Sequence, residues 1–283
     1  MNLISVVVTT YNRPDALLAC LNSLIAQSDR NFEILIADDG SGQSTRQAIE
    51  RFQAEQLTTV IEHVYQQDRG FRAGTIRNKA VARSRGDYIV FIDGDCVVFP
   101  NFVAMHRKLA ESGYFVAGNR ILLSREFTEI VLNMHILLNR KSLLYFFGLF
   151  LTGKINHYFQ LIGLPLGFLR RLHKRQWKKA KTCNLGLWRR DFTAVNGFDE
   201  TFEGWGYEDS DLVIRLIHAG TFRKNGRHAV PVLHLWHCEY DRSREPLNFQ
   251  KLLKRLNDKF STFAEQGYNR YVESAVPSDR EKR

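Results

Sequence analysis

The sequence has little cysteine, and no two cysteines are spaced as C-x-x-C. Its four cysteines lie far apart along 283 residues, which excludes a disulfide framework and a structural zinc site of the usual spacing. A reduced, cytoplasmic compartment is therefore expected. No basic flank precedes an apolar run at the start of the chain, so we expect neither a signal peptide nor an anchor there.

Two phosphate-binding motifs are also absent. No G-x-G-x-x-G follows the first expected strand, and no G-x-x-x-x-G-K-S/T occurs, so dinucleotide and P-loop chemistry lack their phosphate cradles. If a nucleotide binds, a metal ion has to carry its diphosphate. Hydrophobic residues at 44% and charged residues at 25% exclude a disordered or collagenous chain.

Acidic residues are missing from one long stretch. Residues 130–190 hold no Asp or Glu and twelve Lys or Arg, whereas the whole chain has 40 basic and 30 acidic residues. Seven of the twelve lie at 170–181, after apolar runs at 143–151 and 158–169. Apolar runs beside basic residues are typical of a segment in the interface of an anionic membrane, so residues 143–181 are expected to contact one. A buried helical hairpin with a solvated basic end is the alternative, and no nucleic-acid partner is expected.

Short β-branched runs alternate with helical patterns over the first hundred residues. This rhythm predicts an α/β fold with a Rossmann-like, mixed but largely parallel sheet that is flanked by helices. The acid-free segment is predicted to be a helical, basic and apolar insertion. We expect four parts, at residues 1–125, 126–181, 182–245 and 246–283, with a basic amphipathic helix at 249–263 in the last.

Polar residues follow three of the expected strands. The first strand leads into Thr10 and Asn12, the second into residues 38–39, and a later one into the Asp-Gly-Asp of residues 93–95. The carboxyl ends of parallel strands form the ligand-binding edge of such a sheet. Two carboxylates on either side of a flexible glycine can reach a divalent ion and a ribose hydroxyl. Asn12 is also expected to cap the helix that begins near Pro14.

A second acidic pair, Glu208 and Asp209, precedes a helical pattern that ends near Gly220. A helix N-terminus favours ionised carboxylates, although acidic residues are common in first turns without any function. Trp205 lies between two glycines just before this pair. An exposed indole in that setting suits stacking on a sugar face.

Taken together, these motifs resemble family 2 glycosyltransferases with the GT-A fold. The similar segments occur in the order of the family: VVVTTYNR at 6–13, IADDGS at 36–41, GFR with RN at 70–78, and DGD at 93–95. NGFDE at 196–200 and GWGYEDSD at 204–211 are similar to the C-terminal motif of galactosyltransferase-like and chondroitin-polymerase-like members.

The resemblance implies an inverting hexosyltransferase. Its donor would be a nucleotide-sugar, a UDP-sugar, and its acceptor a lipid-linked, lipopolysaccharide or polysaccharide glycan. The residues implied to hold the donor are Thr10, Asn12, Asp39, Arg72, Arg77 and Asp93. Trp205 and Gly206 would contact the acceptor. Asp209 would be the base that takes the acceptor proton, with Glu208 beside it.

The resemblance also implies a divalent ion, Mn²⁺ or Mg²⁺, which neutralises charge on the leaving diphosphate. Asp95 would be one ligand and His237 another, with His234 as the alternative to His237. Residues three apart on a strand point to opposite faces, so only one histidine is expected to reach the ion.

On this interpretation residues 1–125 bind the nucleotide-sugar, 126–181 contact the membrane, 182–245 bind the acceptor and perform catalysis, and 246–283 form a helix and tail. The enzyme would be cytoplasmic and peripheral on the inner face of the cytoplasmic membrane. Two other classes stay open. A metal-dependent nucleotidyltransferase would usually have a glycine-rich phosphate loop, which is lacking here. A non-enzymatic protein that binds anionic surfaces would leave Asp93, Asp95, Glu208 and Asp209 unexplained.

Overall fold

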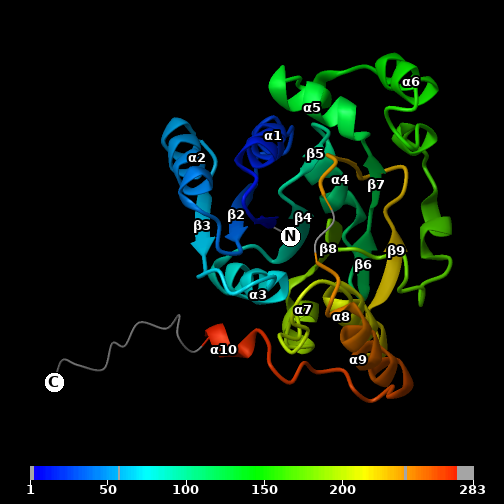
Figure 1. The fold of residues 1–283 in the computed structure, drawn as a ribbon. Helices are drawn as coiled ribbons and strands as arrows, with labels where there is room; N and C mark the ends of the chain where they lie inside the picture. The colour runs from blue at the N-terminus through cyan, green and yellow to red at the C-terminus, as the bar shows by residue number, and fades with distance from the viewer. Residues whose placement is uncertain (1–2, 57, 239–240, 273–283) are drawn as a thin grey trace.

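The computed structural model describes residues 3–56, 58–238 and 241–272, and its main element is a seven-stranded sheet (Figure 1). The strand order is β3 (Ile61–Tyr65), β2 (Phe32–Asp38), β1 (Ile4–Thr10), β4 (Tyr88–Asp93), β8 (Asn184–Trp188), β6 (Tyr114–Ala117) and β9 (Phe222–Asn225). All neighbours are parallel except that β8 runs antiparallel to both β4 and β6. The predicted mixed, largely parallel sheet is therefore confirmed.

Helices cover both faces of this sheet because its strands consist of consecutive apolar residues. Val6 and Val8 of β1 face a core shared with α1 (Pro14–Ile25), α2 (Gln43–Glu55) and α4 (Phe102–Leu109). Val7 lies in the core on the other face, which is shared with α3 (Ala73–Arg83), α7 (Arg189–Ala194) and α8 (Glu208–His218). Successive side chains of a strand point to opposite faces of the sheet, so a run of consecutive apolar residues fills the cores on both faces.

The predicted insertion packs on a second sheet of three strands, β5 (Cys96–Val98), β10 (Pro231–His234) and β7 (Asn119–Leu122). Its helices α5 (Arg125–Asn133) and α6 (Leu143–Leu151) lie together at the top of Figure 1. Short 3₁₀ helices follow the order η1 (Leu138–Arg140), η2 (Phe159–Leu161) and η3 (Gly167–Arg171). One apolar cluster joins Phe146 of α6 and Phe127 of α5 to Leu233 of β10. Among the helices that the structure describes, none has the length and apolar content needed to cross a bilayer.

The C-terminal helix α9 (Glu245–Asn257) begins and ends earlier than the predicted 249–263, and the short α10 (Asn269–Val272) follows it. A proline in the first turn of α9 sets its start, because proline is favoured where the backbone N–H has no helical partner. Helix α9 packs on α8, at the bottom of Figure 1.

Candidate active site

The carboxyl ends of β1, β2 and β4 open into a cavity of about 1260 Å³. The strand register places Thr10 opposite Asp38 and Thr9 opposite Asp93, so the polar residues of the three strand ends meet as predicted. Of the predicted site residues, the following line this cavity: Thr10, Asp39, Arg72, Arg77, Asp93, Asp95, Trp205, Gly206, Glu208, Asp209 and His237.

Asn12 is the predicted site residue that does not line the cavity. It also does not cap α1, whose N-cap position is Arg13 without a side-chain hydrogen bond. Instead, the Asn12 side-chain oxygen accepts the Gly42 N–H at 2.8 Å, and its own N–H donates to Ser41 at 2.9 Å. With φ at 51°, Asn12 adopts the left-handed conformation that asparagine tolerates. The capping prediction is wrong, because the Asn12 side chain holds the loop after β2 instead, whereas its contact with the donor stays a prediction.

The two neighbouring aspartates after β2 have different surroundings. Asp39 faces the cavity and accepts the Arg72 backbone N–H at 2.7 Å and the Gln66 amide at 2.6 Å. Burial raises the pKa of Asp39 against these two hydrogen bonds. The Asp38 carboxylate lies 3.0 Å from Nε2 of His63 and accepts the Ser41 N–H at 2.8 Å. Burial raises the pKa of Asp38, but these two contacts outweigh it and hold the pKa below its ordinary value.

Arg77 joins the two acidic groups that the sequence predicts. It is 4% exposed, and its guanidinium donates to Thr9 Oγ1 at 2.9 Å, to Asp93 at 3.1 Å and to Glu208 at 3.4 Å. Asp93 ends β4 and Glu208 begins α8, so one buried cation connects the predicted donor-binding half with the predicted catalytic half. Burial raises the pKa of Asp93 although Arg77 acts against it.

Three possible metal ligands converge beside these residues. One ligand atom each of Asp95, His234 and His237 lies within 4.8 Å of the other two. Nε2 of His234 is 3.5 Å and Nε2 of His237 is 3.6 Å from the Asp95 carboxylate, and Arg13 donates to the same carboxylate at 3.3 Å. The expectation that only one histidine reaches this point is wrong. Strand β10 ends at His234, so the alternation of side chains no longer applies at His237.

The second acidic pair opens α8, where the chain bends at Tyr207 with φ at 71°. Asp209 accepts Lys181 Nζ at 3.3 Å and the Ser210 hydroxyl at 3.1 Å. Burial, with the neighbouring Asp209 carboxylate, raises the pKa of Glu208 to about 7 against the attraction of Arg77. Glu208 therefore keeps its proton to a higher pH than an ordinary glutamate does.

Trp205 lies on the cavity wall, but it is half-buried rather than exposed as predicted. The Arg242 guanidinium lies over its ring, 4.4 Å from the centroid, which is a cation–π contact. The flanking Gly204 and Gly206 have φ of 74° and 113°. A Cβ at Gly204 would lie 2.8 Å from Arg244, so the glycine is needed for this close approach.

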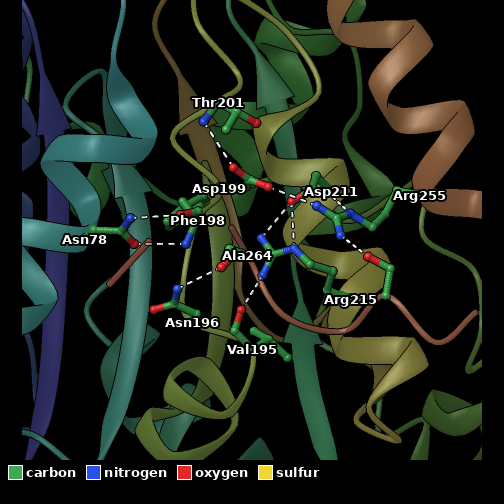
Figure 2. A network of polar contacts seen from close by, with 11 residues as sticks. Asn78, Val195, Asn196, Phe198, Asp199, Thr201, Asp211, Arg215, Arg255 and Ala264 are labelled. Carbon is green, nitrogen blue, oxygen red and sulfur yellow. Dashed lines mark hydrogen bonds and ion pairs between the residues drawn. The ribbon is translucent and has the colours of Figure 1, made fainter. Parts of the chain in front are cut away.

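A buried polar network holds α8 in place (Figure 2). Asp211, one turn into α8, accepts Arg215 at 2.7 Å and Arg255 of α9 at 2.8 Å. Arg255 also donates to Asp199 at 2.9 Å. Asn78 of α3 exchanges hydrogen bonds with the Phe198 backbone at 2.9 Å, as Figure 2 shows. The network thus fixes α8 to α9, and α3 to the loop that contains Phe198 and Asp199.

Sequence reasoning missed the cavity residues Arg13, Lys181 and Arg242. Arg13 is the last residue of the VVVTTYNR motif, so this motif could have identified it as a site residue. Lys181 belongs to the basic cluster that the sequence predicts to contact a membrane, and in the structure it lines the cavity, with its ammonium group 3.3 Å from the Asp209 carboxylate. No pattern in the sequence predicts the contact between Arg242 and Trp205.

The sheet and its acidic edge define a GT-A fold, which the comparisons with known proteins confirm. The family model for glycosyl transferase family 2 matches residues 5–174, and the model for the N-terminal domain of galactosyltransferase matches residues 170–230. The first match covers more than half of the chain, so this chain belongs to glycosyl transferase family 2. The predicted family and its galactosyltransferase-like segment are confirmed, and the match continues through most of the predicted insertion.

The individual relatives share about a third of their residues with this chain or fewer. Validoxylamine A glucosyltransferase of Streptomyces hygroscopicus subsp. jinggangensis is 31% identical over 225 residues, which are 76% of this chain and 51% of that protein. The chain therefore spans about half the length of this relative. Residues 1–349 of Staphylococcus aureus TarS, in complex with UDP-GlcNAc, superpose with a TM-score of 0.60 at 14% identity, covering 95% of this chain and 69% of that one.

A second structural neighbour is the mannosyltransferase PcManGT from Pyrobaculum calidifontis, in complex with GDP-Man and Mn²⁺. Its TM-score is 0.55 at 14% identity, with 92% of this chain and 73% of that chain covered. At such identities the two structures show the fold alone.

Proposed function

We propose that this protein is an inverting, metal-dependent glycosyltransferase that moves a hexose from a UDP-sugar to a hydroxyl of a polysaccharide or lipid-linked glycan. One observation carries the proposal. Carboxylates at the end of β4 and carboxylates at the start of α8 line the same cavity, and Arg77 contacts a member of each group. Sugar transfer with inversion needs one group to support the leaving diphosphate and another to take the acceptor proton.

The donor would lie along the ends of β1, β2 and β4. Asp39 and Thr10 would contact the base and ribose, as the family resemblance implies, with Asp93 toward the ribose. A UDP-sugar is supported by the neighbour TarS, whose structure holds UDP-GlcNAc. Arg72 lines this part of the cavity as well.

The residues present fit a divalent ion. Asp95, His234 and His237 supply a carboxylate oxygen and two imidazole nitrogens from positions close enough to share one ion. Two imidazoles suit Mn²⁺ better than Mg²⁺, which prefers oxygen ligands and retains its waters. The ion would act as a Lewis acid on the diphosphate of the donor.

The family resemblance implies that Asp209 is the base of the acidic pair. The Glu208 carboxyl group is engaged by the Arg77 guanidinium at 3.4 Å, which leaves it less free to take the acceptor proton. The carboxylate of Asp209 is oriented by Lys181 and Ser210. In the reaction the acceptor oxygen bonds to the anomeric carbon, its proton passes to Asp209, and the bond from that carbon to the diphosphate oxygen breaks on the opposite face. The pair of electrons leaves with the nucleoside diphosphate.

Thermal unfolding with nucleotide-sugars tests this proposal. UDP-sugar with Mn²⁺ at about 100 times its Kd adds about 2.7 kcal/mol of stability, which is a rise of about 5 °C in Tm for a chain of this size. Asp95→Ala is expected to abolish the Mn²⁺-dependent part, and His234→Asn and His237→Asn each to reduce it. His157→Asn, at an exposed histidine of the insertion, is the matched control.

Two results would overturn the proposal. An Asp95→Ala protein that keeps the full Mn²⁺-dependent rise would remove the metal site. Turnover of a nucleoside triphosphate without any sugar transfer would instead favour a nucleotidyltransferase.

A further inference from the structure

Helix α6 is apolar on all sides, but the residues that the structure describes cover only one side of it. Its sequence, LLYFFGLFL, contains no charged residue. Phe146 and Leu149 are buried in the cluster shared with β10. On the opposite side Leu144 is 77% and Leu151 is 68% exposed, with Phe147 between them at 38%. Residues 144, 147 and 151 follow a helical spacing, so they form one continuous apolar face.

More apolar side chains continue this face. Phe159 of η2 is 66% exposed and lies 6.4 Å from Phe150, measured between ring centroids. A helix with apolar residues all round belongs in a protein core or in lipid. The exposed face of α6 therefore requires a partner that the described residues do not supply.

Positive charge borders the face, and no negative charge is near it in the sequence. Arg140 and Lys141 precede α6, and Lys154 follows it. The Lys141 ammonium lies over the Tyr145 ring at 5.3 Å, and the Lys154 ammonium over Phe127 at 5.7 Å, so both cations lie at the margin of the apolar cluster. Since residues 130–190 contain no Asp or Glu, the surface complements an anionic partner.

The basic cluster at 170–181 is less free than the sequence suggests. Arg170 is 6% exposed and donates to the backbone oxygens of Leu164, Asn225 and Arg227, so it cannot reach a membrane. Arg171 pairs with Glu111 at 2.6 Å. The Lys174 ammonium lies over the Phe222 ring, 4.7 Å from its centroid. Arg170 and Arg171 are therefore engaged within the protein, whereas the cations at the two ends of α6 border its exposed apolar face.

We propose that α6 is a membrane-docking helix, which lies flat in the headgroup region of an anionic bilayer with Leu144, Phe147 and Leu151 toward the acyl chains. At about 1.5 Å per residue its nine residues are about 14 Å long, which is too short to cross a core of about 30 Å. Docking is therefore reversible and sensitive to salt, because an interfacial helix depends on both apolar insertion and headgroup charge. The inference does not depend on the proposed catalytic function.

Sedimentation with vesicles tests the docking. Wild type is compared on phosphatidylcholine vesicles with 30% phosphatidylglycerol and on pure phosphatidylcholine, at about 0.05 M and 0.5 M salt. The face variant is Leu144→Ser with Leu151→Ser, and the charge variant changes Arg140, Lys141 and Lys154 to Gln. Leu247→Ser with Leu253→Ser on α9 is the control, because these leucines are 51% and 43% exposed but far from α6.

We expect the face variant to bind anionic vesicles at least tenfold more weakly than wild type, and the charge variant to lose its preference for anionic over neutral vesicles. The α9 control should bind as wild type does. Equal binding of the face variant and wild type, or no binding by wild type, overturns the proposal. A dimer that forms in wild type and is lost in the face variant, with no vesicle binding, overturns it in favour of a second copy of the chain.

The Mn²⁺-dependent thermal shift is measured on the same proteins. All three variants should retain it, since none of the changed residues lines the cavity. Loss of vesicle binding with an intact thermal shift concerns the docking alone, whereas loss of the thermal shift in wild type concerns the proposed function alone.

Discussion

Glu208→Gln is expected to stabilise the protein at alkaline pH and to have much less effect at acid pH. Glu208 is 8% exposed, and its pKa lies at about 7 against an ordinary 4.5. Between these two values the folded protein binds a proton that the unfolded chain has released, so stability falls as pH rises through this window. Glutamine keeps an oxygen for the Arg77 hydrogen bond but has no proton to lose.

The magnitude follows from the two pKa values. At 1.36 kcal/mol per pKa unit, the ionised Glu208 costs the folded state about 3 kcal/mol at pH 8, whereas at pH 5 the cost is below about 1 kcal/mol. At about 2 °C per kcal/mol, the gain in Tm of the variant over wild type should grow by about 5 °C between pH 5 and pH 8.

The assay is thermal unfolding of both proteins at several pH values, without metal or nucleotide. Glu50→Gln, at an exposed glutamate of α2, is the matched control and should show no such growth with pH. A Tm difference for Glu208→Gln that is the same at pH 5 and pH 8 would refute the argument. It would mean that burial beside Asp209 does not keep the proton on Glu208.

Two further predictions concern the same helix. Asp209→Asn should retain UDP affinity in the presence of Mn²⁺ but reduce transfer by about 10²-fold to 10⁴-fold, since the amide cannot take the acceptor proton. Calorimetry measures the UDP affinity and a transfer assay measures the rate. An active Asp209→Asn variant together with an inactive Glu208→Gln variant would assign the base to Glu208. Arg255→Met should lower the free energy of unfolding by about 3 kcal/mol, because it leaves the Asp199 carboxylate buried without a cation, whereas Asp211 keeps Arg215. Urea unfolding measures it against Arg51→Met on the exposed side of α2, and a loss equal to that of the control would argue against the network as a support of α8.

The sheet and the acidic edge were predictable because they depend on local patterns. Short β-branched runs predict buried strands, and parallel strands bring their carboxyl ends together. This places Asp39 and Asp93 in one cavity without any knowledge of distant contacts. The acidic start of α8 was predictable for the same reason, since a helical pattern begins right after it.

The other parts of the site depend on where strands end and on contacts across the chain. His234 and His237 converge because β10 stops between them, and the end of a strand is the least certain feature of a sequence pattern. Arg77 and Glu208 are 131 residues apart, and no local signal connects them. Arg170 resembles its exposed neighbours in sequence, but backbone oxygens of a distant loop bury it.

Arg77 also makes the two ends of the cavity thermodynamically dependent on each other. A single guanidinium divides its attraction between Asp93, where a donor would arrive, and Glu208, which carries a titrating proton. A ligand that draws this cation toward Asp93 weakens its hold on Glu208 and raises the proton affinity there. Linkage is reciprocal, so a proton on Glu208 strengthens the binding of that same ligand by an equal free energy. Ligand binding at Asp93 and protonation of Glu208 are thus coupled through the single charge of Arg77.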